Sequence, residues 1–231
     1  MPTSFQLLFL FEPWVPVIDN VVVRGQLLDT IHNVSFPFKP LMIGTVAEEG
    51  FGFLHTPGMI PLSPALYIES LLIGFRQHAS KVLERYPPQG TGDQRSLAAK
   101  LITQWGFACP NRVFARKAGT YLYVYGYPPD FDGWLFTPDC QGHVCHGDEL
   151  AYLFQSAWDN FTDAGRRVSQ SMATAWTNFG KTHDPNQPVP LSTRWPKAGL
   201  AESYLYFQEP ARAGRGYLKD DCDFWDSIGY H

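Results

Sequence analysis

The sequence predicts an α/β fold with a largely parallel sheet, and three observations support this fold class. Short runs rich in β-branched and aromatic residues alternate with longer amphipathic segments along most of the chain, which is typical of strands joined by helices. Hydrophobic residues make up 45% of the 231 residues and charged residues 17%, so one large core can form. No repeat, low-complexity tract or linker divides the chain. We therefore expect residues 1–231 to form one structural unit.

The first predicted strand lies near the start of the chain, after an extended segment. Proline and β-branched residues are frequent over residues 12–40, and they favour extended backbone over helix. The run Leu41–Val46 is short and apolar and is followed by acids and a glycine, which is typical of a strand buried on both faces. Glu48 and Glu49 follow it, and catalytic groups collect at such strand ends. A solvated loop or a helix start is the alternative interpretation of these acids.

Helical segments occupy the middle of the chain. Ser63 and Pro64 predict the start of a helix that continues to about Leu83. Its expected apolar side comprises Leu66, Ile68, Leu71, Leu72 and Phe75. After a proline- and glycine-rich loop, a second helix is expected from near Asp93 through Trp105, and another turn or two over Cys109–Ala118.

A second strand is predicted at Tyr121–Tyr125, where aromatic and aliphatic residues alternate and glycines lie on both sides of the run. A long loop, Pro128–Val144, follows and leads to a short helix at Glu149–Phe154. The expected apolar residues of that helix are Leu150, Leu153 and Phe154.

The last third of the chain predicts a long helix over Asp163–Lys181, a final edge strand over Tyr204–Phe207 and a terminal helix that begins near Cys222. The long helix has Val168, Met172, Ala175, Trp176 and Phe179 at helical spacing. Three predicted strands are few for a sheet with so many helices. This count suggests that the front of the domain is absent from the sequence.

Charge and hydropathy exclude two classes of partner. The formal net charge is -4 and no basic run occurs, which argues against a nucleic-acid partner. No window approaches the roughly 18 apolar residues that a membrane span requires. The apolar run Leu7–Phe11 has no basic residue before it and no small-residue cleavage site after it, so it is a poor signal peptide.

Cysteines and sequons favour a secreted protein or one of the secretory pathway. The chain has four cysteines, an even number that suits disulfides. Asn33-Val-Ser and Asn160-Phe-Thr are acceptor sequences for N-glycosylation. We expect glycans at both asparagines.

The stretch Cys140–Phe154 contains the strongest candidate for chemistry. It places two cysteines and two histidines, His143 and His146, in a glycine-containing turn before a helical segment. A loop that holds an imidazole still suits proton transfer, although an ordinary surface loop is the alternative. A zinc site would need a second ligand pair, which Cys109 and Cys222 do not form. We therefore expect neither a metal nor a cofactor.

Glu49 and a histidine of this loop have the order of the acid and base of an acyl-transfer triad. At these residues the sequence resembles the type-B carboxylesterases, which include the cholinesterases and their non-enzymatic adhesion relatives. Ile43–Gly50 is similar to that family's acid motif, Gly-x-Asn-x-Asp-Glu-Gly, although Asn is replaced here. Val144–Leu150 resembles its His-Gly-x-Glu motif. The resemblance implies that Glu49 is the triad acid and that His146 is the base, and it leaves His143 as a loop residue without a role.

Trp176–Asn186 is similar to a third family motif, Trp-x-Asn-Phe-Ala-x-x-Gly-x-Pro-Asn. Gly180 replaces the alanine of this motif, and His183 replaces its glycine. The resemblance runs from Pro16 to Trp225, where Cys-x-Phe-Trp matches a fourth motif. It implies the C-terminal part of an α/β-hydrolase fold.

The same resemblance implies a disulfide between Cys109 and Cys222, which is found in the cholinesterase branch. Cys140 and Cys145 are then left for each other. A second disulfide that rigidifies the loop of His146 is expected, and two free thiols are the alternative.

The main departure from the family is that no Gly-x-Ser-x-Gly occurs in the chain. We therefore expect a carboxylic-ester hydrolase fragment that contributes Glu49 and His146 to a triad whose serine lies elsewhere, and that is inactive alone. The alternatives are a non-catalytic cholinesterase-like binding or adhesion protein and a pseudoenzyme fragment. The partners implied are a small-molecule carboxylic ester, uncharged or cationic, and a missing N-terminal half or a docking partner. Trp134, Phe136 and Phe154 are candidates for an aromatic wall, with core packing as the favoured alternative.

Overall fold

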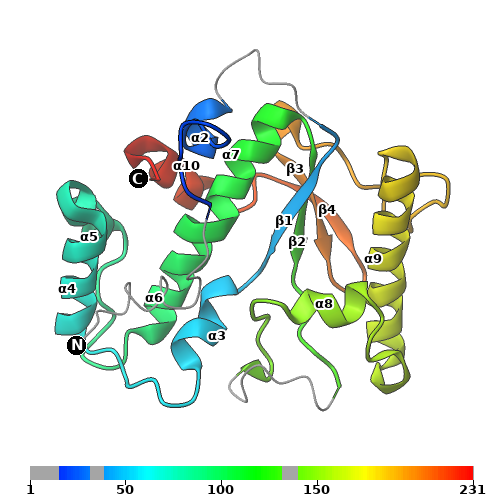
Figure 1. Ribbon diagram of the computed structural model, residues 1–231. Helices are drawn as coiled ribbons and strands as arrows, with labels where there is room; N and C mark the ends of the chain where they lie inside the picture. The colour runs from blue at the N-terminus through cyan, green and yellow to red at the C-terminus, as the bar shows by residue number, and fades with distance from the viewer. Residues whose placement is uncertain (1–15, 32–38, 132–139, 231) are drawn as a thin grey trace.

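The computed structural model describes residues 16–31, 39–131 and 140–230. Its sheet has the order β1-β2-β3-β4, with β1 at Met42–Val46, β2 at Tyr121–Tyr125, β3 at Ser203–Phe207 and β4 at Arg212–Arg215. The first three strands are parallel, and β4 is antiparallel to β3. Helices lie on both faces of this mixed sheet (Figure 1). The prediction of an α/β fold is therefore confirmed.

The predicted last strand exists, but its prediction as an edge strand is wrong. β3 lies between β2 and β4 in the sheet. The outer strand β4 reads Arg-Ala-Gly-Arg and is mostly exposed, so it carries no alternating apolar pattern. β4 pairs with β3 because the chain turns back after Phe207. The sequence contains only a weak hairpin signal at this turn.

The helices of the described residues follow the predicted segments with several differences. Their bounds are α2 Leu27–Thr30, α3 Glu49–His55, α4 Pro64–Phe75, α5 Ala79–Arg85, α6 Arg95–Ile102, α7 Cys109–Ala118, α8 Asp148–Leu153, α9 Asp163–Thr182 and α10 Lys219–Ile228. The short helix α2 interrupts the segment that was expected to be extended throughout. The helix expected over 63–83 is divided at Arg76, whose φ of 46° cannot continue an α-helix.

One face of the sheet packs against α8 and α9, and the other packs against α7 (Figure 1). On the first face Tyr125 and Phe207 belong to the same buried cluster as Met172 of α9, and all three are fully buried. On the second face Leu122 packs against Ala115 of α7. Gly44 of β1 leaves room for the ring of its partner Tyr123 in β2, because a Cβ at Gly44 would lie 2.3 Å from that ring.

The apolar sides expected for two helices are partly wrong. In α4 the buried residues include Tyr67, Leu71 and Phe75, whereas Leu66 and Leu72 are 45% and 56% exposed. Apolar residues lie on most sides of this helix, so the spacing of its apolar residues does not indicate which face packs against the protein. In α8 the buried residues are Asp148, Ala151 and Tyr152, whereas Leu150 is 41% exposed.

The helices α6 and α7, predicted as separate pieces, are joined by a π-helical segment, Thr103–Ala108. Such segments are rare and often occur at functional sites, because the wider turn redirects side chains. Thr103 and Phe107 of this segment both lie near the candidate site described below.

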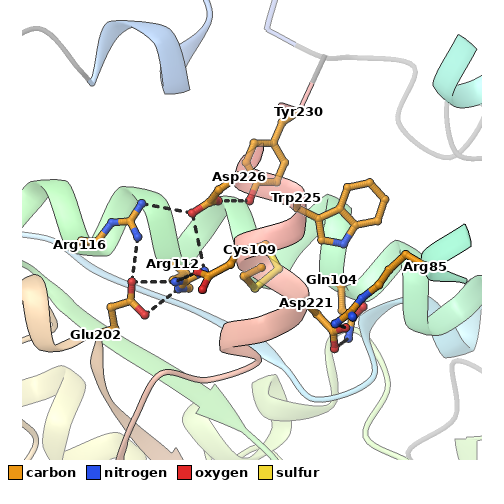
Figure 2. Close-up of a disulfide and its surroundings, with 12 residues drawn as sticks. Arg85, Gln104, Cys109, Arg112, Arg116, Glu202, Asp221, Trp225, Asp226 and Tyr230 are labelled. Carbon is orange, nitrogen blue, oxygen red and sulfur yellow. Dashed lines mark hydrogen bonds and ion pairs between the residues drawn. A yellow bond between two sulfur atoms is a disulfide. The ribbon is translucent and has the colours of Figure 1, made fainter. Parts of the chain in front are cut away.

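The C-terminal helix α10 is fastened to α7 by a disulfide and a charged network (Figure 2). Cys109 and Cys222 form the disulfide, and both are fully buried. Beside it, Arg112 donates to both oxygens of Glu202, at 2.9 and 2.8 Å, and to Asp223 at 2.5 Å. Although burial opposes it, hydrogen bonds from Arg112 lower the pKa of Glu202. The carboxylates of this network compensate the positive charge of the Arg112 guanidinium, which is only 3% exposed.

Candidate active site

Glu49 begins α3, immediately beyond the carboxyl end of β1, and is 5% exposed. Its Oε1 accepts hydrogen bonds from the N–H of Val46 at 2.9 Å and from Thr45 Oγ1 at 2.8 Å. Its Oε2 lies 2.5 Å from Nδ1 of His146. Both carboxylate oxygens are therefore held, and one of them faces the imidazole.

The backbone of Glu49 is fixed by contact between α3 and α6. The N–H of Gly50 donates to Thr103 Oγ1 at 3.0 Å, and that hydroxyl donates to the carbonyl oxygen of Ala99 at 2.9 Å. A Cβ at Gly50 would lie 2.4 Å from this same carbonyl oxygen. Glycine is therefore required for α3 to approach α6 closely enough to place the acid.

His146 directly follows a small loop that is closed by a disulfide between Cys140 and Cys145. We call residues 140–147 the base loop. This disulfide packs over Gly52 of α3, where a Cβ would lie 3.5 Å from Cys140 Sγ. Past the histidine, the chain turns through Gly147, whose φ of 89° favours glycine. The base loop is thus clamped on one side and packed against the helix of the acid on the other.

Two aromatic rings flank the imidazole of His146. The ring centroids of Phe53 and Phe107 lie 5.2 and 5.6 Å from it. The side chain of His146 remains 49% exposed. The spacing of these phenylalanines does not distinguish them from core residues, so the sequence contains no signal that places them beside His146.

Glu149, three residues after His146, is an acid whose environment was not foreseen from the sequence. Its Oε2 is buried and has no hydrogen-bond partner among the described residues. Burial raises the pKa of Glu149, and the nearby charge of Glu49 raises it further, while His146 opposes the shift. Burial, with added charge from Glu149 and Glu49, also raises the pKa of Tyr123.

His143, left without a role by the sequence, has an acidic partner of its own. Its Nδ1 lies 2.9 Å from Oε1 of Glu48, the residue before the candidate acid. The ring of Phe51 stacks on the ring of His143 with centroids 3.7 Å apart.

The structure forms the Cys109–Cys222 disulfide that the resemblance implied and the expected second disulfide between Cys140 and Cys145, so the alternative of free thiols is wrong. Disulfide-bonded Cys140 and Cys145 cannot be thiolate ligands, and the described residues contain no cluster suited to a metal ion. The same residues contain no helix that is long and apolar enough to cross a bilayer.

Several other predicted residues are placed as follows. Asn33, Trp134 and Phe136 lie outside the described residues. Asn160 ends a short 3₁₀ turn and is exposed. Phe154 is 73% exposed, so the core packing favoured for it is wrong; its wall role stays a prediction.

Comparisons with known proteins agree with the geometry. The model of the carboxylesterase family matches residues 5–225. The chain is 27% identical, over 98% of its length, to Crystal protein of Dictyostelium discoideum, and the match covers 44% of that protein. It is 27% identical, over 82% of its length, to the cAMP-regulated D2 protein of the same organism, covering 37% of it. It is 25% identical, over 92% of its length, to Acetylcholinesterase 1 of Caenorhabditis elegans, covering 41% of it.

The chain thus spans less than half the length of these relatives. Its parallel strands, the helices on both faces of the sheet and a family match over nearly all residues point to one conclusion. This chain belongs to the carboxylesterase family.

Proposed function

We propose that this chain supplies the acid and the base of a serine carboxylic-ester hydrolase. The observation that carries the proposal is the 2.5 Å contact between Glu49 Oε2 and His146 Nδ1 at the carboxyl end of β1. A carboxylate at Nδ1 favours the tautomer that has its proton on Nδ1 and its lone pair on Nε2. Nε2 then takes the proton of a serine hydroxyl as that oxygen attacks the ester carbonyl. The same proton is returned to the leaving alcohol.

Glu49 has two tasks in this scheme. It orients the imidazole, and it stabilises the imidazolium that forms when the serine is deprotonated. The hydrogen bonds from Thr45 and Val46 support both tasks, because they fix the carboxylate against rotation.

The nucleophile is not in this chain, since no Gly-x-Ser-x-Gly occurs in its 231 residues. We place the serine and the oxyanion hole on other sequence of the same protein, and residues 1–231 form the C-terminal portion of the domain. Two facts support this. The chain covers at most 44% of the relatives reported above, and in the described part β1 has a neighbour, β2, on one side alone. The chain by itself would be inactive.

Fluorophosphonate labelling of the protein from its natural source tests the proposal. We expect a labelled species at least about twice the 26.1 kDa of this chain, because the chain covers 44% of its relative Crystal protein. In the product of the complete gene, Glu49→Gln should lower the rate of ester hydrolysis by about 10⁴-fold, because it favours the wrong tautomer. Glu84→Gln, a change at an exposed position of α5, is the matched control. An unlabelled species at 26.1 kDa would refute catalysis.

The absence of the nucleophile motif favours a second candidate function, a non-catalytic cholinesterase-like binding or adhesion protein or a pseudoenzyme fragment. The paired Glu49 and His146 argue against it, because a protein without catalysis has no need to retain their contact. The unlabelled outcome above would select this candidate.

The proposed substrate is a small-molecule carboxylic ester, uncharged or cationic. Phe53 and Phe107 beside His146 supply apolar rings suited to such a ligand. Rates with p-nitrophenyl acetate and acetylthiocholine would separate the neutral and cationic classes.

We also propose that the protein is secreted or enters the secretory pathway, with glycans at Asn33 and Asn160. The two disulfides support an oxidising compartment, and Asn160 is exposed to a glycosyltransferase. Treatment with an N-glycosidase should lower the mass of the natural protein. In Asn160→Gln this loss of mass should be smaller by the mass of one glycan.

A further inference from the structure

A second glutamate–histidine pair lies beside the candidate catalytic pair. Glu48 directly precedes Glu49, and His143 lies in the same loop as His146. Glu48 Oε1 is 2.9 Å from His143 Nδ1, and Glu48 Oε2 accepts a hydrogen bond from the N–H of Val144 at 2.9 Å. The N–H of Glu48 also donates to the carbonyl oxygen of Val144, at 3.1 Å. Three contacts therefore join Glu48 to the base loop, next to the contact between Glu49 and His146.

The two adjacent acids point in different directions. The side chain of Glu48 is 40% exposed and that of Glu49 is 6% exposed. Glu48 precedes the helix with φ at -132° and ψ at 52°, outside the helical region, whereas Glu49 is its first helical residue. This change of backbone conformation lets one acid reach His143 and the next reach His146.

Aromatic stacking fixes the plane of the His143 ring. Phe51 of α3 stacks on it with an interplanar angle of 18°. On its other side Phe51 stacks on His55, with centroids 4.0 Å apart and an angle of 9°. Stacking sets the plane of the ring of His143, and the contact with Glu48 sets which edge of the ring faces the acid.

We propose that Glu48 and His143 are positioning residues that hold the base loop so that Nδ1 of His146 meets Glu49. They act through the loop backbone at Val144 and touch neither the substrate nor the reacting atoms. The need for such a device follows from geometry, since misplacement of a catalytic group by about 1 Å can cost about 100-fold in rate. The kinetic test of this inference, described next, measures kcat and therefore rests on the proposed esterase function.

Kinetics of the complete gene product provide the first test. Glu48→Gln keeps the size of the side chain but loses one of its two acceptor oxygens. His143→Ala removes the ring, and His143→Asn restores a nitrogen donor near the position of Nδ1. We expect kcat to fall about tenfold or more in Glu48→Gln and His143→Ala with KM unchanged, and to recover in part in His143→Asn.

His55→Ala is the matched control, because it removes the other ring stacked on Phe51 without touching Glu48. We expect its kcat to equal that of the wild type. If His55→Ala and His143→Ala lose kcat equally, or if each loss follows the fall in melting temperature, the residues are merely structural and the inference is overturned.

Proton NMR of the complete gene product without substrate provides a test that needs no catalysis. The Nδ1 proton of His146 in its short contact with Glu49 should give a far-downfield resonance. In Glu48→Gln and His143→Ala we expect this signal to broaden or vanish at a pH where it is sharp in the wild type. An unchanged signal together with unchanged kcat would overturn the inference. Absence of ester hydrolysis in the wild type would refute the proposed function alone, and the resonance would still decide the role of Glu48 and His143.

Discussion

The two disulfides allow stability and catalysis to be separated by one pair of variants. Cys109–Cys222 closes a loop of 113 residues, and Cys140–Cys145 closes a loop of 5 residues. The proposed change is replacement of both cysteines of either bridge by alanine. Each variant loses two buried sulfur atoms, so the cost of lost packing is similar and the loop length differs.

The chain-entropy relation gives the magnitude. Removing the bridge over 113 residues should cost about 4.8 kcal/mol of unfolding free energy, and removing the bridge over 5 residues about 2.1 kcal/mol. The expected difference between the two variants is about 2.7 kcal/mol. Urea unfolding at one pH, followed by circular dichroism, measures both free energies from midpoint and slope.

The variant that loses less unfolding free energy should lose more kcat. Cys145 directly precedes His146, and its bridge packs on Gly52 of the helix that begins with Glu49. Loss of this bridge should therefore lower kcat of the complete gene product about tenfold or more, whereas loss of Cys109–Cys222 should leave kcat unchanged at temperatures where the variant is folded. Equal costs in unfolding free energy would refute the chain-entropy reasoning. Equal effects on kcat would refute the role of the small bridge in presenting the base.

Three further predictions concern stability. Burial places the pKa of Glu149 above its reference value of 4.5, so ionisation favours the unfolded chain as the pH rises past 4.5. Glu149→Gln should gain unfolding free energy over the wild type as the pH rises from about 4 to about 7, and urea unfolding at both ends checks this. Glu202→Gln should cost about 3 kcal/mol, because the guanidinium of Arg112 stays buried with one of its three acidic partners lost; Arg112→Met in the same background should recover part of it. Gly50→Ala should cost about 1–3 kcal/mol through its clash with α6, whereas Gly180→Ala, at an open helical position, should stabilise by about 0.5–1 kcal/mol in thermal unfolding.

The strands and the long helices were predictable because their signals are local. Tyr121–Tyr125 alternates aromatic and aliphatic residues, and Thr162 caps a 20-residue helix whose buried residues recur every three or four positions. β4 was missed because four polar and small residues gain their pairing from a neighbouring strand and have no pattern of their own. The buried face of α4 was misjudged because its apolar residues surround the helix, and only its packing partners select a side.

The sequence by itself determined the α/β class, the order of the elements and, through motifs, the identity of Glu49 and His146 as a candidate pair. Only the tertiary structure decided what surrounds that pair: the buried Glu149, the rings of Phe53 and Phe107, and the contact between Glu48 and His143. The physical reason is that strand and helix propensities depend on neighbours along the chain. The position of an acid relative to an imidazole 97 residues away depends on how two loops pack after the sheet has formed.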